Sequence, residues 1–297
     1  WQLHIPISYS YYLPMPNNLQ TKFATPYLRG ELEAFKKSVE GWTGKQITDN
    51  DLDKGIEIMN QSRRLMKQVY ETRKSDNPPM TGLEAMYMAV SNQMIDKREH
   101  SKVLEEALKM LPKRKLNREP GARLMIVGSE DDDTEFINMV ESVGATIVID
   151  DHCTGSRYFW NEVHPVRSEH GSKNNTLLRS DSVLSDASNG AGPEPDRLNA
   201  IAQRYIDRPA CPSKDWPVRT RLPHILKLAQ DYNVQGAIVI QQKFCDPHEL
   251  DIPAINKMFK ENNIPTLFLE FDVTVPIGPF KTRVQAFLEM ISEDALF

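Results

Sequence analysis

The chain has 297 residues, with 26% charged and 40% hydrophobic residues, as in an ordinary water-soluble globular protein. The formal net charge of −5 argues against a general nucleic-acid or membrane-surface binder. No apolar run approaches the roughly 20 residues that span a bilayer, and the first residues lack the pattern of a signal peptide. Three cysteines without a CxxC spacing favour a reducing cytoplasm over a disulfide scaffold.

The first 118 residues are predicted to be a mostly helical region. Apolar residues recur at helical spacing from Leu28 to Trp42, and a second helix is expected to begin near Thr48 or Asp49 and to run to Lys74. A third helical stretch is expected over 82–110, followed by a basic linker bounded by prolines. This region contains no chemical motif, so we expect it to serve as scaffold or interdomain packing.

The pattern changes at Ala122. Strands are predicted at 123–127 and 145–149, with a helix between them whose acidic start at 131–133 suits the helix dipole. A later block predicts a helix over 216–232, a strand over 236–240, a helix over 246–262, a strand over 265–270 and a helix over 280–292. Strands that alternate with helices predict an α/β fold, with an open, mostly parallel, Rossmann-like doubly wound sheet over 119–297. The polar stretch at about 164–196 is expected to be a surface insertion.

Polar sequences follow the predicted strands, at the sheet edge where ligands of such folds bind. The third strand leads into Gln241-Gln242-Lys243-Phe244-Cys245 and then into a helix. Helix N-terminal N–H groups and a nearby lysine lower a thiol pKa, and a thiolate is the ligand of a soft metal or an iron–sulfur cluster. The alternative is that Cys245 is a small buried residue at a strand end, and the residues alone leave the two interpretations evenly balanced.

The other cysteines are weaker candidates for a metal site. Cys153 has His152 and Asp151 beside it, and Cys211 lies between prolines, but neither shows the close ligand pairs of a zinc site, so packing is the favoured role for both. The sequence contains no P-loop, no G-x-G-x-x-G and no G-x-S-x-G, so we expect no nucleotide site and no hydrolase elbow. A nucleophile pair of Cys245 with His248 is the least favoured alternative.

Three C-terminal motifs in one order carry a family resemblance. They are Lys243-Phe-Cys-Asp-Pro247, Leu269-Glu270-x-Asp272, and Thr282-Arg283-x-x-Ala286-Phe287-Leu288-Glu289. Together with "VIDDHCTGSRYFW", they make the chain resemble the benzoyl-CoA reductase / 2-hydroxyacyl-CoA dehydratase family over its whole length, most of all the B-type catalytic subunits of the ATP-dependent reductases.

The resemblance implies a 4Fe-4S cluster held by three cysteines. In the family, two of them come from an N-terminal domain, most of which this chain is expected to lack, and one comes from the Phe-Cys-Asp-Pro motif, which Cys245 matches. Cys153 and Cys211 do not fall on the usual ligand positions, and they remain candidates because their loops could face the cluster. Gln242 and Lys243 are expected to lie next to the ligands, without binding the cluster, and to influence the electrostatics around it. Glu270, Asp272 and Arg283 are equally well explained as structural pairs.

The same resemblance implies the reaction and the partners. The leading expectation is ATP-driven, low-potential electron transfer to an aromatic acyl-CoA, which yields a cyclic dienoyl-CoA. The expected partners are a homologous second catalytic subunit, ATP-hydrolysing activator subunits, a ferredoxin donor and the acyl-CoA substrate, with no nucleic acid or membrane. The alternatives are a 2-hydroxyacyl-CoA dehydratase subunit and a non-catalytic partner subunit without its own cluster.

Overall fold

A computed structural model describes residues 4–164 and 196–294. The chain divides into two compact units. The first comprises residues 1–57, 163–210 and 214–220, and the second comprises 58–162, 211–213 and 221–297. The expected domain bounds of 1–118 and 119–297 stay a prediction, and nearly all of the expected insertion at 164–196 lies outside the described residues.

The helical region begins with four long helices. They are α1 (Ala24–Thr43), α2 (Asp49–Glu71), α3 (Gly82–Met94) and α4 (Lys97–Met110). The sequence predicted one helical stretch over 82–110, but the structure breaks it at Ile95 and Asp96. Asp96 accepts a hydrogen bond from the Arg98 backbone N–H at 2.9 Å and so caps a new helix.

A four-stranded, all-parallel sheet confirms the predicted α/β fold. Its strands are β1 (Ala122–Gly128), β2 (Ala145–Asp151), β3 (Gly236–Gln242) and β4 (Thr266–Phe271), in the order β2-β1-β3-β4. The chain starts with β1 in the middle, moves outward to β2, and then crosses β1 to form β3. The order therefore reverses between β1 and β3, which is where ligands bind in open sheets of this kind.

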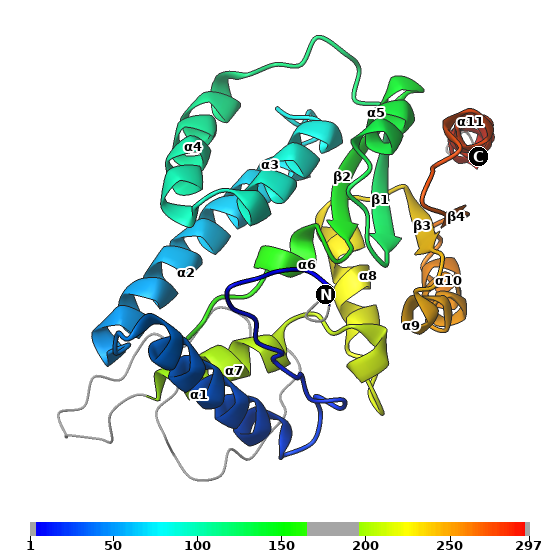
Figure 1. Ribbon diagram of the computed structural model, residues 1–297. Coiled ribbons are helices and arrows are strands. Elements are labelled where there is room, and N and C mark those ends of the chain that lie inside the picture. The colour runs from blue at the N-terminus through cyan, green and yellow to red at the C-terminus, as the bar shows by residue number, and fades with distance from the viewer. Residues whose placement is uncertain (1–3, 165–195, 295–297) are drawn as a thin grey trace, which may run out of the picture. The chain divides into compact units, whose positions relative to one another are not determined.

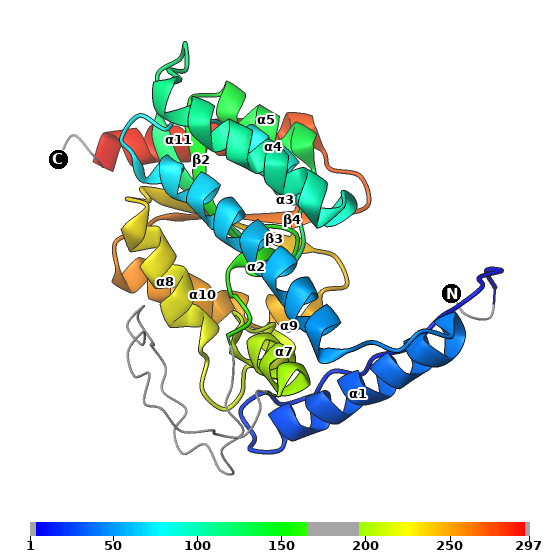
Figure 2. The same cartoon turned by 90° about the vertical axis from the view of Figure 1, so that its left-hand side faces the viewer.

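Helices cover both faces of this sheet. Figure 2 shows α8 and α10 on one side of the strands and α5 and α11 on the other. The later helices are α5 (Thr134–Ser142), α6 (Ser156–Phe159), α7 (Arg197–Asp207), α8 (Arg221–Asp231), α9 (Asp246–Glu249), α10 (Ile252–Glu261) and α11 (Ile277–Asp294). The predicted acidic start of α5 is explained by Asp133, whose side chain accepts the Phe136 N–H at 2.8 Å.

Two apolar cores result, one on each face of the sheet. Alternate residues of β1 divide between them, so that Met125 and Val127 join α2, α8 and α10, while Leu124 and Ile126 join α5 and α11. Because both faces are covered, the strands are almost continuously apolar. Figure 1 shows the four strands side by side, with their carboxyl ends at one edge.

The first unit is held by polar contacts between α1, α7 and the start of α2. Arg29 donates to Asp196 at 3.0 Å, and Arg197 donates to Asp53 at 2.9 Å. Both ion pairs are partly exposed, so they determine which helices pack together more than they stabilise the fold. Within the described ranges, no helix has the length and apolar character that crossing a membrane requires.

Candidate functional site

The Cys245 turn is built by the end of β3 and the start of α9. The Cys245 N–H donates to the Gln242 carbonyl at 3.0 Å, which closes a tight turn between strand and helix. Phe244 within it has a φ of 69°, a left-handed conformation that costs a non-glycine residue about 1–2 kcal/mol. Its side chain is 92% exposed, so no packing explains the strain. Such strain at an exposed residue marks a turn whose shape serves the group beside it.

Two buried side chains lock this turn. The Gln241 amide donates to the carbonyls of Gln242 at 2.9 Å and Cys245 at 3.1 Å. Ser129, at the end of β1, accepts the Gln242 N–H at 3.0 Å through its hydroxyl. The sequence suggested roles for Gln242 and Lys243 but none for Ser129 or Gln241. Ser129 and Gln241 directly follow apolar strand runs and lie on the ligand-binding edge.

Cys153 lies in a loop fixed to the same strand ends. Its N–H donates to the Ser129 carbonyl at 2.9 Å, so Ser129 joins the Cys153 loop to the Cys245 turn. A side chain at Gly155 would place its Cβ 2.1 Å from an Asp150 oxygen, so only glycine fits there. The Arg157 guanidinium donates to Cys153 Sγ at 3.6 Å.

The third cysteine, Cys211, belongs to the same compact unit as the other two. Partial desolvation raises the pKa of the exposed Cys153 thiol, Arg157 opposes that shift, and negative charge at Cys211 or Cys245 raises the pKa further. All three belong to the second unit, although they are separated in the sequence by up to 92 residues (153 to 245). The sequence placed Cys153 and Cys245 on one edge, and the structure connects their loops there through Ser129.

A buried ionic cluster supports this edge from below. Asp151, fully buried, accepts from Arg221 Nε at 2.7 Å and lies 3.6 Å from Arg157 Nε. Burial alone raises the pKa of Asp151, but Arg221 and Arg157 outweigh it and hold that pKa well below its ordinary value. Both arginines also donate to the Gly128 carbonyl, at 2.7 Å from Arg157 and 3.1 Å from Arg221. The cluster thus fixes two guanidinium groups beneath the cysteine loops.

His248 does not form a nucleophile pair with Cys245. Its ring is buried, and its Nδ1 lies 3.1 Å from Arg221 Nη1. Burial and then the Arg221 charge lower its pKa to about 3, so it stays a neutral member of the ionic cluster. Within the described ranges, no group of three or more histidine, cysteine or acidic side chains is gathered tightly enough for a single metal ion.

The remaining candidates lie at the exposed side of the edge. Lys243 Nζ pairs with Asp272 at 2.8 Å, which raises the lysine pKa, and each side chain is nearly half exposed. Arg283 donates to the Phe268 carbonyl at 2.7 Å. These contacts agree with structural roles for Asp272 and Arg283, and Glu270 is exposed.

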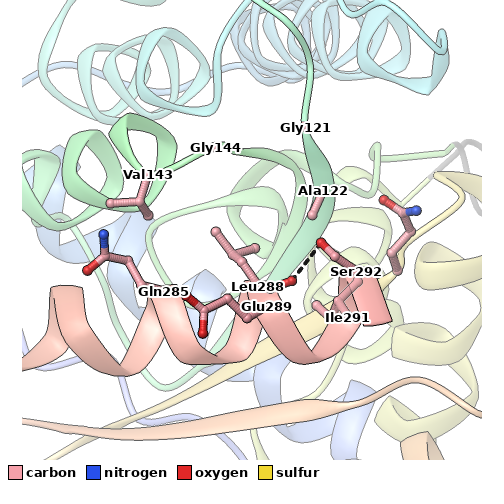
Figure 3. A pocket seen from close by; sticks show the side chains of 10 residues that line it. Gly121, Ala122, Val143, Gly144, Gln285, Leu288, Glu289, Ile291 and Ser292 are labelled. Carbon is pink, nitrogen blue, oxygen red and sulfur yellow. Dashed lines mark hydrogen bonds between the residues drawn. The ribbon is translucent and has the colours of Figure 1, made fainter. Parts of the chain in front are cut away.

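A wide depression of the second unit lies away from the cysteines. Figure 3 shows it along α11, beside Gly144 and Leu288. Its lining contains the carboxylate of Glu289 but no cysteine, histidine or cationic side chain. It lies at the amino ends of the strands, opposite the cysteines, and offers none of their chemistry.

The comparison with known families agrees with the fold and the motifs. The family model described as 2-hydroxyglutaryl-CoA dehydratase, D-component, matches residues 1–180 and 176–291. The chain belongs to this family. The match covers the helical region as well as the sheet, so the family assignment does not depend on the Cys245 motif alone.

Named relatives include both dehydratases and a reductase. The chain is 24% identical to the (R)-phenyllactyl-CoA dehydratase beta subunit of Clostridium sporogenes, over 93% of this chain and 67% of that protein. It is 23% identical to a benzoyl-CoA reductase subunit of Thauera aromatica, over 98% and 69%. It is 22% identical to the lactoyl-CoA dehydratase subunit beta of Anaerotignum propionicum, over 93% and 67%. The expected family is confirmed, while the narrower likeness to B-type subunits has no support among these relatives.

Proposed function

We propose that this chain is the iron–sulfur subunit of an enzyme that transfers low-potential electrons to an acyl-CoA thioester. The observation that carries the proposal is the Cys245 turn at the carboxyl edge of the sheet, which Gln241 and Ser129 lock and which Ser129 joins to the Cys153 loop. Thiolates are the ligands that iron–sulfur clusters require. A four-iron cluster is larger than a single ion, so its ligands need not meet within one coordination sphere. We therefore propose a 4Fe-4S cluster at this edge, with Cys245 as its principal ligand.

Each cysteine has a defined part in this proposal. Cys245 is the principal ligand, because its strained turn is locked by Gln241 and Ser129. Cys153 and Cys211 are the weaker candidates for further ligands. When bound, the cluster would supply one-electron transfer to the thioester substrate.

The residues behind the ligands would hold and tune the site. Ser129 ties the Cys153 loop to the Cys245 turn, so movement of one loop displaces the other. Gln242 contributes its backbone to the turn, and Lys243 offers an exposed positive charge that Asp272 partly neutralises. This arrangement supports a role for Gln242 and Lys243 in positioning and electrostatics rather than in ligation.

For the substrate, we retain an aromatic acyl-CoA reduced to a cyclic dienoyl-CoA, as in a benzoyl-CoA reductase. The likeness to the benzoyl-CoA reductase subunit of Thauera aromatica over 98% of this chain supports it. ATP hydrolysis would then take place on separate activator subunits, with a ferredoxin as electron donor and a homologous second subunit as partner. The relatives are named as subunits, which supports assembly with another chain.

A 2-hydroxyacyl-CoA dehydratase subunit is the second candidate. The family model and two of the named relatives carry dehydratase names, which favours it. Anaerobic assays with activator and ATP, with benzoyl-CoA in one series and a 2-hydroxyacyl-CoA in the other, separate the two activities. Turnover of neither substrate, together with no iron in this subunit, would support the third alternative, a non-catalytic partner.

The test of the cluster itself is iron and sulfide analysis with electron paramagnetic resonance on the anaerobically purified complex. We expect Cys245→Ala to remove or degrade the cluster signal, whereas Cys211→Ala should leave most of it in place. Glu249→Ala, which changes an exposed residue of the same short helix outside the motif, is the matched control and should retain full iron. Full iron content in Cys245→Ala would refute the proposal.

A further inference from the structure

A small cavity lies in the interior of the second unit, where the chain after α2 packs against β2. Its lining combines apolar side chains with four polar ones, which are Tyr70, Arg73, Asp150 and His152. All four are buried, with exposed fractions between 0% and 4%. The cavity volume is about 10 Å³, close to the roughly 10–15 Å³ that a single water molecule needs. The cavity therefore admits one water and no larger ligand.

Arg73 brings a buried positive charge to this cavity. It belongs to η1 (Thr72–Lys74), the short 3-10 helix after α2. Its Nη1 donates to the Ile147 carbonyl at 3.2 Å, and its Cζ lies 3.9 Å from the centre of the Tyr70 ring. Among the residues that the structure describes, Arg73 Nε and Nη2 have no hydrogen-bond partner. Because buried donors are rarely left unpaired, these two nitrogens indicate a ligand that accepts hydrogen bonds.

His152 presents an acceptor to the same cavity. The Thr154 hydroxyl donates its single hydrogen to the Asp131 carbonyl, so it accepts from His152 Nδ1, which lies 3.1 Å away. We therefore assign a proton to Nδ1. Burial lowers the pKa of His152, so the ring is neutral and its Nε2 carries a lone pair instead of a proton. Within the described ranges, this Nε2 has no hydrogen-bond partner.

Asp150 is a second acceptor beside His152. Its Oδ1 accepts the Ser156 N–H at 2.6 Å and lies 3.7 Å from His152 Nε2. A carboxylate oxygen and an unprotonated ring nitrogen cannot bond to each other, so they need a shared donor. A water molecule offers two hydrogens for these two acceptors and two lone pairs for the donors of Arg73.

We propose that one internal water occupies this cavity, where it accepts from Arg73 and donates to His152 Nε2 and Asp150. This inference goes beyond the proposed function and does not depend on it. The water links the Arg73 guanidinium to the Asp150 carboxylate, so a buried cation and a buried anion are paired through it. A bridging water serves nearly as well as a direct hydrogen bond, and it replaces the hydration that these groups have in the unfolded chain.

The water stabilises the loop that follows β2. Asp150 holds Ser156 twice, because its carboxylate accepts the Ser156 N–H and its backbone carbonyl accepts the Ser156 hydroxyl at 2.6 Å. These bonds close the loop of residues 152–155, and the Cys153 N–H of that loop donates to the Ser129 carbonyl. The bridge from Arg73 therefore fixes Asp150 and, through it, one side of the carboxyl edge.

The direct test is a crystal structure of the full chain at a resolution that shows internal water. We expect one density peak within hydrogen-bonding distance of Arg73, His152 Nε2 and Asp150. A direct contact between Arg73 and Asp150, with no peak in the cavity, would overturn the inference.

Oxygen-17 magnetic relaxation dispersion counts long-lived internal waters in solution. The double variant Arg73→Met/His152→Phe removes the guanidinium and the imidazole, which leaves too few polar partners for a water that needs two to four. The count of long-lived waters should therefore fall by one. Arg98→Met/His4→Phe, which changes an exposed arginine and an exposed histidine, is the matched control and should keep the wild-type count. A wild-type count in the folded double variant would overturn the inference.

The third measurement is made on the wild-type protein and decides the matter if the double variant does not fold. Nitrogen NMR of histidine-labelled protein reports the protonation of each ring nitrogen, and the spectrum of His152→Gln identifies the His152 signals. We expect a proton on Nδ1 and a hydrogen-bonded lone pair on Nε2. A proton on Nε2 would overturn the inference, because the ring would then donate to Asp150 directly. A lone pair on Nε2 without a hydrogen bond would overturn it as well.

Discussion

Replacement of Asp151 by asparagine tests whether the buried ionic cluster organises the cysteine edge. Asp151 is fully buried and is the last residue of β2. Its carboxylate is 2.7 Å from Arg221 Nε, 3.6 Å from Arg157 Nε and 3.9 Å from His224 Nε2. The asparagine side chain would keep the shape but remove the charge, leaving two buried guanidinium groups without their shared counter-ion.

The magnitude follows from the burial of the pair. Two unit charges about 4 Å apart interact with roughly 4 kcal/mol at an effective dielectric constant of 20. Breaking a buried pair costs about 3–5 kcal/mol, because the remaining charge stays desolvated. The carboxylate pKa is held below its ordinary value of about 3.9, so the stabilisation is fully present above that pH and is lost as the pH falls below it. At pH 7.5 we therefore expect Asp151→Asn to lower the free energy of unfolding by about 3–5 kcal/mol.

The assay is urea unfolding followed by the fluorescence of Trp160, with the other tryptophans changed to phenylalanine. Trp160 packs edge-to-face on His224 at 5.8 Å, so it reports on this cluster. The matched control is Asp272→Asn, which breaks the nearly half-exposed pair with Lys243 and should leave the urea midpoint at the wild-type value. A midpoint for Asp151→Asn equal to that of the control would refute the reasoning.

Three further predictions concern strain, buried hydrogen bonds and pH. Phe244→Gly should stabilise the fold by about 1 kcal/mol in urea unfolding, because glycine adopts the left-handed φ freely; equal gain from Val273→Gly, equally exposed but not left-handed, would contradict this. Glu141→Ala should lower the free energy of unfolding by about 3 kcal/mol in urea, because three backbone N–H groups and Arg118 lose their acceptor. Glu135→Ala changes an exposed residue of the same helix and is the control. The pKa of His248 is about 3 in the folded protein and about 6.5 in the unfolded chain. Protonation of the unfolded chain should therefore lower the free energy of unfolding by about 2 kcal/mol between pH values above 6.5 and pH 5. His248→Gln should weaken this dependence of the unfolding free energy on pH.

Local patterns in the sequence were sufficient for the fold class and for most of the secondary structure, although α6 and α7 were not predicted and the helix expected over 246–262 is divided into α9 and α10. Helical spacing placed α1 and α2, and short apolar runs between turn residues placed all four strands within a few residues. These features are readable because hydrophobic periodicity and turn chemistry act over short distances along the chain. The α3–α4 region was the less exact part, since the break at Asp96 depends on a single cap.

The Cys245 position was also readable, because the strand, the turn and the helix that frame it are consecutive in the sequence. The family resemblance supported that position from three motifs. The connection of the Cys153 loop to the Cys245 turn through Ser129 was not readable, because Ser129 comes from a third segment of the chain.

The tertiary structure alone decided what surrounds the sulfur atoms. Parallel strands bring Ser129, Asp151 and Gln241 to one edge from segments up to 112 residues apart (129 to 241), and α8 adds Arg221 from below. A buried charge is tolerated only where its partners arrive from other elements, and no local pattern reveals those partners. The sequence by itself therefore determined most of the helices and strands and the best ligand candidate, Cys245. The order in which the strands cross in the sheet determined which charged side chains surround the site.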